Sequence, residues 1–335
     1  MAPRHDTFKM AKFSTFAANI SRLLDRTMPI LAPLGVVMGI LLPFIFINLR
    51  PFVPWLFGIM TLSGALKLKA RDVIQAVKNP MPIVFFFLTS RLIMPLVVLF
   101  LSSMIFGDDS DTISGYVLLY SVPTAVSGFI WVSIFKGDSA LALALILLDT
   151  LLAPLVVPGT VRLLLGTKAT LDMAGMTMSL IYMIVIPTII GVALNELSRG
   201  AVPKLIDPYM GSLSKICLVL VISANCAAVA PQFNPKNIRI WIIAAVCICF
   251  IILGFSFGKL TGLVGRHFGL LGKSSKEKEV SIFFASGLRN ISAAMTLGIE
   301  FFPQAASLPT VLGVVFQQSI CAIMGRLYLG KIPEK

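Results

Sequence analysis

Charged side chains are scarce in this sequence. Asp, Glu, Lys and Arg together make up 13% of the 335 residues, whereas they make up roughly a quarter of an ordinary soluble domain. Acidic residues are the rarest, with 15 against 28 lysines and arginines. The five cysteines all lie inside apolar segments and lack the spacing of a metal site, so we interpret them as small packing residues. This composition excludes a soluble globular protein and predicts no metal cofactor.

The residues of enzyme chemistry are also few. The two histidines, His5 and His267, both lie in segments that we expect to be cytoplasmic, and no apolar segment carries a histidine pair, a paired-aspartate motif or a serine with a nearby histidine. We therefore expect no enzymatic activity and no catalytic residue. Two other kinds of function are considered, an anion channel and an anion-sensing membrane receptor. The sequence has neither the rings of like residues expected of a channel nor the soluble signalling domain expected of a receptor.

Long apolar segments are abundant instead. Hydrophobic residues make up 57% of the chain, and the mean hydropathy is +0.93. Segments of the length that crosses a bilayer, about 17 to 25 residues, can be placed ten times. The sequence therefore predicts an all-α polytopic membrane protein with ten transmembrane helices in a lipid bilayer. The expected spans are residues 29–47, 52–66, 81–106, 113–135, 139–165, 173–194, 210–229, 238–260, 280–302 and 306–327.

The basic residues predict the orientation in the membrane. Most of them fall in the first 28 residues and in alternate connections such as 67–78 and 259–278, whereas the acidic run GDDSD at 107–111 falls on the other side. Because short cytoplasmic loops are enriched in Lys and Arg, both termini are expected in the cytoplasm, in an inner or plasma membrane. The net charge of +13 is then explained by the basic cytoplasmic loops, and we expect no nucleic-acid partner. Residues 1–28 lack the apolar core of a removed signal, so we interpret them as a cytoplasmic amphipathic segment.

The ten spans divide into two halves of five. An odd number of crossings per half reverses the second half, so residues 29–165 and 172–329 are expected to form inverted repeats, followed by a cytoplasmic tail at 330–335. The fourth span is interrupted at 122–128 and its counterpart, the ninth, at 285–290. Such paired breaks are typical of transporters whose binding site lies at the membrane midplane.

Arg289 lies in the middle of the ninth apolar segment. An ionisable group at that depth costs at least a few kcal/mol, so it indicates a functional site; the alternative is an arginine packed between helices in a structural ion pair. The third and fifth spans carry Arg91 and Asp149. If Asp149 pairs with one arginine, the other can attract an anionic ligand; alternatively, Asp149 titrates as in proton-coupled carriers. Besides these three charges, the candidate site residues are Asn290, Ser127, Thr124, Phe129, Gln318 and Ser319 for the substrate, and Ser90 for charge pairing or coupling.

Several motifs together resemble the bile acid:sodium symporter family. They are GALKLKARDV at 64–73, PTAVSGFIWVSIFKGDSALALAL at 123–145, DTLLAPLVVP at 149–158 and SGLRNISAAM at 286–295. The resemblance covers nearly the whole chain. It implies a carrier with a panel domain of spans 1, 2, 6 and 7 and a core domain of spans 3–5 and 8–10. In such a carrier the broken fourth and ninth helices cross, and the core moves against the panel to expose the crossing to either side.

The residues that would bind sodium in that family are largely replaced. By the resemblance, a Ser-Asn pair becomes Gly128 and Phe129, a Ser and a Thr become Ala142 and Ile146, a bridging Glu becomes Ala285, and two Gln become Arg289 and Ser90. A fixed cation repels sodium, by several kcal/mol at about 4 Å and moderate dielectric. We therefore expect no sodium coupling and interpret Arg289 as a permanent replacement for the bound ion.

The same resemblance bears on the ligand. Asn290 keeps the identity that contacts substrate in the family, and Gln318 and Ser319 stand where the family often has a His-Asn pair. Phe129 is either a contact for an apolar part of the ligand or a packing residue. The predicted function is secondary-active transport of a small organic anion by alternating access. A sodium symporter whose ion is held by backbone carbonyls and Ser90 is the second reading, and the sequence leaves the anion, the coupling ion (Na⁺ or H⁺) and the oligomeric state open.

Overall fold

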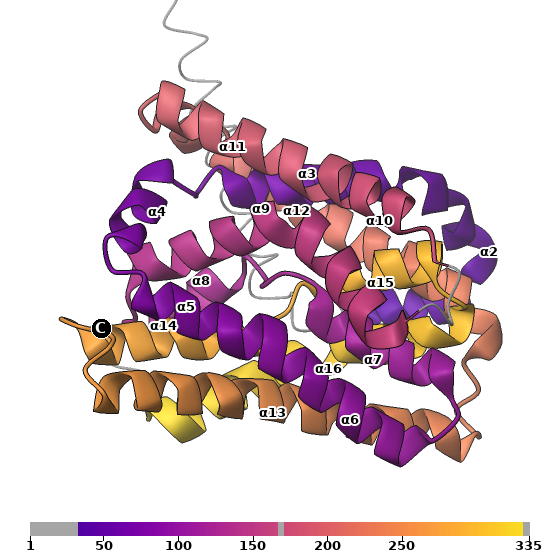
Figure 1. The fold of residues 1–335 in the computed structure, drawn as a ribbon. Coiled ribbons are helices and arrows are strands. Elements are labelled where there is room, and N and C mark those ends of the chain that lie inside the picture. The colour runs from indigo at the N-terminus through magenta and orange to yellow at the C-terminus, as the bar shows by residue number, and fades with distance from the viewer. Residues whose placement is uncertain (1–32, 167–170, 331–335) are drawn as a thin grey trace, which may run out of the picture.

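The computed structural model describes residues 33–166 and 171–330, which are helical or lie in short connections, with no strand (Figure 1). Residues 33–41 are helical. The other elements are α2 (Pro43–Phe46), η1 (Ile47–Phe52), α3 (Val53–Ala65), α4 (Ala70–Val77), α5 (Met81–Phe87), η2 (Leu88–Ile93), α6 (Met94–Phe106), α7 (Ser110–Ser121), α8 (Gly128–Ile134), α9 (Ser139–Leu165), α10 (Met173–Leu180), η4 (Ile181–Val185), α11 (Ile186–Leu197), α12 (Ala201–Val229), η5 (Ala230–Gln232), α13 (Ile238–His267), α14 (Ser275–Gly287), α15 (Ile291–Phe301), η6 (Gln304–Ser307) and α16 (Leu308–Leu329).

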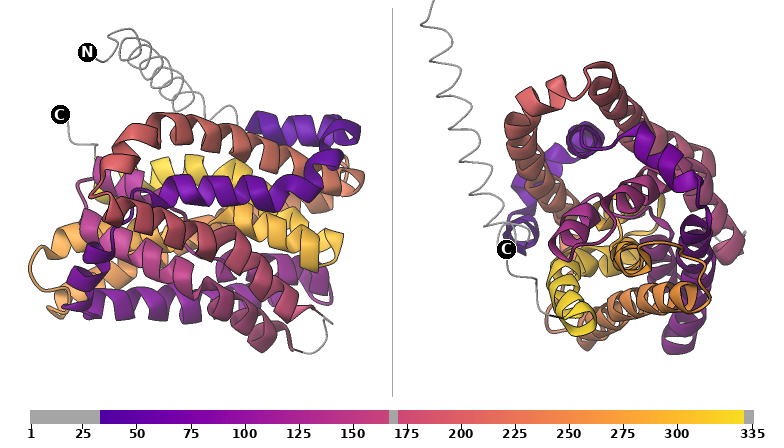
Figure 2. Two further views of the ribbon diagram at one scale, coloured as in Figure 1. Left: turned by 90° about the horizontal axis from the view of Figure 1, so that it is seen from above. Right: turned by 90° about the vertical axis from the view of Figure 1, so that its left-hand side faces the viewer.

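Seven helical stretches within this part of the chain are long and apolar enough to cross a membrane. Two of them, Met81–Phe106 and Ser139–Leu165, have the bounds predicted from the sequence. The long helices run roughly side by side (Figures 1 and 2). The predicted amphipathic segment at 1–28, the start of the first span and all but the first residue of the predicted tail lie outside the described residues.

The outer surface of this bundle is apolar. Leu197 is 86% exposed, Trp55 77% and Leu155 75%. A water-soluble protein rarely exposes large apolar side chains over so much of its surface. The chain is therefore a multi-pass membrane protein whose outer side chains face lipid.

The predicted fourth and ninth spans are each built from two half-helices. Val122 ends α7 in an extended conformation, with φ −67° and ψ 155°, because the ring of Pro123 disfavours a helical residue before it. The second break is shorter than predicted. The sequence predicts it at 285–290, but α14 continues through Gly287 and only residues 288–290 are non-helical. The physical reason is that Ala285 and Ser286 have no feature that ends a helix, whereas Asn290 caps the next one.

Two wide helical turns were not predicted. The π-helical turns η2 and η4 directly precede the helices that carry Pro95 and Pro187 near their first positions. Proline has no N–H to donate and its ring crowds the preceding turn, so a widened turn accommodates it without ending the span. The first of these turns contains Arg91 and so sets the direction of that side chain.

Aromatic side chains fill the core beside the second break. The ring of Phe255 in α13 packs at a tilt against Phe283 and edge-on against Phe284 of α14, with ring centroids 5.2 and 6.4 Å apart. A Cβ atom on Gly287 would collide with the Phe255 ring. The lack of a side chain at Gly287 therefore allows α14 to end in close contact with α13.

Candidate functional site

The two non-helical segments cross each other and pair through their backbones. Thr124 and Arg289 form an isolated antiparallel bridge. The N–H of Ala125 donates to the Leu288 carbonyl at 3.0 Å, and the N–H of Asn290 donates to the Pro123 carbonyl at 2.8 Å. Backbone groups freed by helix breaks need partners at membrane depth. The pairing supplies them and fixes the end of α7 and the start of α15 to one another.

Thr124 connects both breaks to the fifth predicted span. Its side chain is buried, and its hydroxyl donates to the Ala285 carbonyl and lies 2.9 Å from the Leu288 carbonyl, so it closes the C-terminal end of α14. Its N–H donates to Asp149 Oδ2 at 2.7 Å. A single threonine thus links α9 and α14 to the start of the first break.

Asp149 forms its ion pair with Arg91. Arg91 Nε donates to Asp149 Oδ1 at 2.6 Å, and Nη2 donates to Oδ2. The two side chains are only 7% and 1% exposed. Arg91 Nη1 also donates to the carbonyls of Ser121 and Val122, both at 2.7 Å. The guanidinium therefore neutralises the carboxylate and closes the negative C-terminal end of α7 at the same time.

The Arg289 side chain is buried and has no carboxylate partner among the described residues. It is 1% exposed. Its Nη2 donates to the Ser90 carbonyl at 3.1 Å, and its guanidinium carbon lies 5.8 Å from the centre of the Tyr120 ring. Nε and Nη1 have no hydrogen-bond partner. A guanidinium carries five N–H donors, so most of the hydrogen-bonding capacity of this cation is unused at the crossing of the two breaks.

Gln317 of α16 holds the peptide of Arg289. Its Oε1 accepts from the Arg289 N–H at 3.0 Å, and its Nε2 donates to the Arg289 carbonyl at 2.9 Å. The sequence predicts Gln318 and Ser319 as the site residues of this helix instead. Both are exposed, and Gln318 Oε1 accepts from Trp131 Nε1 at 3.2 Å. Whether Gln317 or Gln318 faces the crossing depends on which face of α16 turns inward. No pattern in the sequence distinguishes these two residues. Tyr120 was missed altogether, since no local signal sets it apart from other core aromatics.

The remaining predicted residues lie around the same crossing. Asn290 caps α15 by accepting from the Ala293 N–H at 3.3 Å. Ser90 donates to Ser286 Oγ at 3.1 Å, in addition to its carbonyl contact with Arg289. Ser127 is the half-buried N-cap residue of α8, and Phe129 in its first turn packs partly buried against the core. The structure thus brings Thr124, Ser90, Asn290 and Arg289 together, with the ion pair of Arg91 and Asp149 beside them.

The positions expected to bind sodium by resemblance supply few oxygen atoms. Ala142, Ile146 and Ala285 are buried, at 1%, 2% and 5% exposure, and their side chains are apolar. The carboxylate of Asp149 is occupied by Arg91 and by the Thr124 amide. Sodium requires hard oxygen ligands, and these three apolar side chains offer none.

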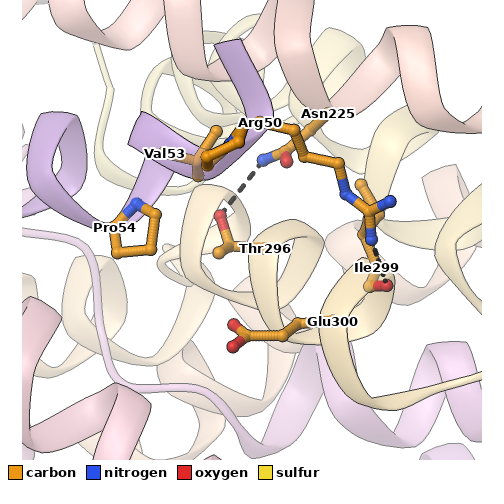
Figure 3. A pocket seen from close by; sticks show the side chains of 8 residues that line it. Arg50, Val53, Pro54, Asn225, Thr296, Ile299 and Glu300 are labelled. Atoms are coloured by element: carbon orange, nitrogen blue, oxygen red, sulfur yellow. Dashed lines mark hydrogen bonds between the residues drawn. The ribbon is translucent and has the colours of Figure 1, made fainter. Parts of the chain in front are cut away.

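A separate pocket of about 320 Å³ lies farther along α15 (Figure 3). Arg50 of η1, Asn225 of α12, and Thr296 and Glu300 of α15 line it together with Pro51, Val53, Pro54 and Ile299. One end of α15 is therefore held in the crossing, and its other end lines this pocket.

Comparisons with known proteins agree with this architecture. The model of the "Sodium Bile acid symporter family" matches residues 53–261. The "Uncharacterized protein YbaS" of Bacillus subtilis (strain 168) is 34% identical over 298 residues, which cover 89% of this chain and 95% of that protein. The "Probable sodium/metabolite cotransporter BASS3, chloroplastic" of Arabidopsis thaliana is 25% identical over 318 residues, covering 93% of this chain and 69% of that protein.

A third relative, the "Uncharacterized sodium-dependent transporter YocS" of Bacillus subtilis (strain 168), is 22% identical over 318 residues, covering 94% of this chain and 95% of that protein. The family match ends before Arg289, but these three alignments span most of the chain. The chain belongs to the sodium bile acid symporter family, which consists of membrane transporters and not of enzymes.

Proposed function

We propose that this protein is a secondary-active carrier that moves small organic anions by alternating access without sodium coupling. The observation that carries the proposal is the buried guanidinium of Arg289 at the helix crossing, where Nε and Nη1 have no hydrogen-bond partner. Buried polar groups are nearly always hydrogen-bonded, so two free donors on one cation favour a ligand with acceptor oxygens. A carboxylate or sulfonate supplies both the acceptors and the opposite charge.

Arg289 is suited to replace a transient cation with a permanent one. The guanidinium stays charged and presents its donors as a planar fork. It is also held in place at both ends, because Gln317 binds its peptide and the Ser90 carbonyl accepts from Nη2. A second cation within about 4 Å would be repelled by about 4 kcal/mol at an effective dielectric constant of 20. Arg289 therefore attracts the anion and disfavours sodium at the same place.

For the architecture, we propose ten crossings in two inverted repeats, residues 29–165 and 172–329, arranged as panel and core. The support is that the break after α7 lies in the first half and the break after α14 at the corresponding place in the second half. The two breaks also pair antiparallel through their backbones. The charge distribution supports cytoplasmic termini in an inner or plasma membrane. In this arrangement the motion of the core against the panel exposes the crossing, with Arg289 and Asn290, to either side of the membrane in turn.

Sodium coupling is the competing function. Two relatives carry names that specify it, a probable sodium/metabolite cotransporter and a sodium-dependent transporter. The carbonyls of Ala285 and Leu288 converge on Thr124 beside Ser90. Such oxygens are ligands that sodium accepts, so this reading has its own structural support.

Thermal unfolding of the purified protein separates the two functions. Each member of a set of small carboxylates and sulfonates is added in sodium buffer and in choline buffer. A ligand that binds only the folded state stabilises it by about 2.7 kcal/mol at a hundredfold excess over Kd. Equal stabilisation in both buffers supports the sodium-independent carrier. Stabilisation that requires sodium overturns it and assigns Arg289 to the scaffold.

A further inference from the structure

Two exposed residues of opposite charge, Arg50 and Glu300, line the pocket between η1, α12 and α15 without forming an ion pair. Arg50 Nη2 donates to the Ile299 carbonyl at 3.1 Å, and Glu300 Oε1 accepts from Ser179 Oγ at 3.1 Å. Within the described residues, no ion pair joins Arg50 to Glu300, although both line the pocket. Each charge thus has one uncharged partner and remains available to a ligand.

Two buried polar side chains, Asn225 and Thr296, form part of the pocket wall. Asn225 and Thr296 are buried, at 2% and 4% exposure, and Asn225 Nδ2 donates to Thr296 Oγ at 3.1 Å (Figure 3). This bond fixes both side chains and leaves the amide oxygen of Asn225 for another donor. A pocket of about 320 Å³ is at the lower end of the range for small-molecule sites. Its occupant is therefore small and carries hydrogen-bonding groups.

We propose that this pocket binds a small zwitterion of the α-amino acid class, with its carboxylate at Arg50 and its ammonium group at Glu300. A simple anion would satisfy Arg50 but bring a like charge toward Glu300, and a simple amine would do the reverse. A ligand with both charges satisfies both residues and offers a donor to Asn225. Complementary charge of this kind gives a site its specificity.

The pocket and the crossing lie at opposite ends of one helix, α15. The eleven residues of α15 span about 16 Å at 1.5 Å per residue. The helix presents Thr296 and Glu300 to the pocket, and Arg289 and Asn290 directly precede its first residue at the crossing. The inference rests on the proposed function and narrows its substrate to carboxylates that also carry an ammonium group, which the pocket selects before the carboxylate binds Arg289.

Pairs of ligands with the same shape test the assignment. Alanine and lactate, serine and glycerate, and leucine and 2-hydroxyisocaproate differ only by an ammonium group in place of a hydroxyl. Binding to the purified protein is measured by thermal unfolding and by calorimetry. We expect at least one amino acid to bind about tenfold more tightly than its hydroxy acid, and Glu300→Gln to abolish that preference while the hydroxy acid binds as well or better. Arg50→Gln is expected to weaken both members of the pair.

A second variant keeps the assignment testable if Glu300→Gln does not fold. Ser179→Ala removes only the hydroxyl that orients Glu300 and should reduce the preference in the same direction. If no pair shows the preference, or if the preference is unchanged in the Glu300 and Ser179 variants, the pocket is not a zwitterion site. Arg289→Gln separates this outcome from failure of the proposed function. This variant should abolish uptake of the ligand into vesicles but leave the preference for the amino acid over its hydroxy acid intact.

Discussion

Arg91 and Asp149 form a buried, bidentate ion pair that also organises the first helix break. The remaining donors of Arg91 close the end of α7 at Ser121 and Val122, and Asp149 accepts from the first amide beyond Pro123. The pair therefore holds both sides of the break in fixed positions. Because it leaves no carboxylate to Arg289, it also accounts for the free charge at the crossing.

Removing the carboxylate charge should damage folding rather than transport alone. Asp149→Asn leaves Arg91 as an uncompensated buried cation, and breaking a buried pair in this way costs about 3 to 5 kcal/mol. We expect a clearly lower thermal midpoint and a lower yield of monodisperse protein. Asp108→Asn, at an exposed position, is the matched control and should change neither. A variant of Asp149 with normal stability but without proton-driven flux would instead assign a titrating role to this residue.

Gln317 and Gln318 form a natural pair of test and control. Gln317→Leu leaves the buried N–H of Arg289 unpaired, which costs about 1 to 3 kcal/mol, and leaves the Arg289 carbonyl with the N–H of Ile291 at 2.9 Å as its remaining partner. Gln318→Leu removes one contact with Trp131 at an exposed position and should cost less than about 1 kcal/mol. Thermal unfolding of both variants measures the difference. Equal effects would show that the peptide of Arg289 does not depend on Gln317.

The end of α14 should tolerate no added side chain. Gly287→Ala places a methyl group against the ring of Phe255, and overpacking of this kind costs about 1 to 3 kcal/mol. Gly159→Ala in α9 is the control, because open space surrounds that position and alanine favours the helix by up to about 1 kcal/mol. Combining Gly287→Ala with Phe255→Leu should recover part of the loss. No recovery would mean that another neighbour limits the space at Gly287.

The sequence was sufficient for features that depend on neighbouring residues. A proline disfavours helix in the residue before it wherever it occurs, so the end of α7 at Val122 was predictable. Hydrophobic length gave the bounds of spans such as Met81–Phe106. The family resemblance was also confirmed, because its motifs are contiguous runs in the sequence.

Features that depend on distant residues were not accessible in this way. Whether Asp149 pairs with Arg91 or with Arg289 is decided by where the π-helical turn η2 directs Arg91. The choice of Gln317 over Gln318 depends on the rotation of α16 about its axis. The pocket at Arg50 and Glu300 joins positions about 250 residues apart, as the bond from Arg50 to Ile299 shows. Hydrophobic patterns contain no information on such pairings.

Replacing Arg289 should distinguish a role of its charge in ligand binding from a structural role in the fold. Arg289→Gln removes the permanent cation but keeps hydrogen-bonding capacity, and hydrogen bonds to a charged group contribute about 1.5 to 3 kcal/mol. We expect binding of the organic anion to weaken about tenfold to a hundredfold in choline buffer. Unfolding measurements without ligand should show little loss of stability, because the burial of an unpaired charge is relieved at the same time. Unchanged anion affinity would contradict a role of Arg289 in the binding site.

The double variant Arg289→Gln with Ala285→Glu tests whether the arginine replaced a sodium ion. Ala285 is buried and its carbonyl accepts from Thr124, so a glutamate there places anionic oxygens beside the crossing. A buried carboxylate without a partner is costly, and sodium is the cation that would relieve it once Arg289 is gone. The expected result is anion binding that strengthens in sodium relative to choline, measured by calorimetry on protein that elutes as a single species. Ala285→Glu alone is the control, since the retained Arg289 should pair with the new carboxylate and leave binding insensitive to sodium. If the folded double variant binds the anion equally well in sodium and in choline, the idea that Arg289 replaced a sodium ion at the crossing is wrong.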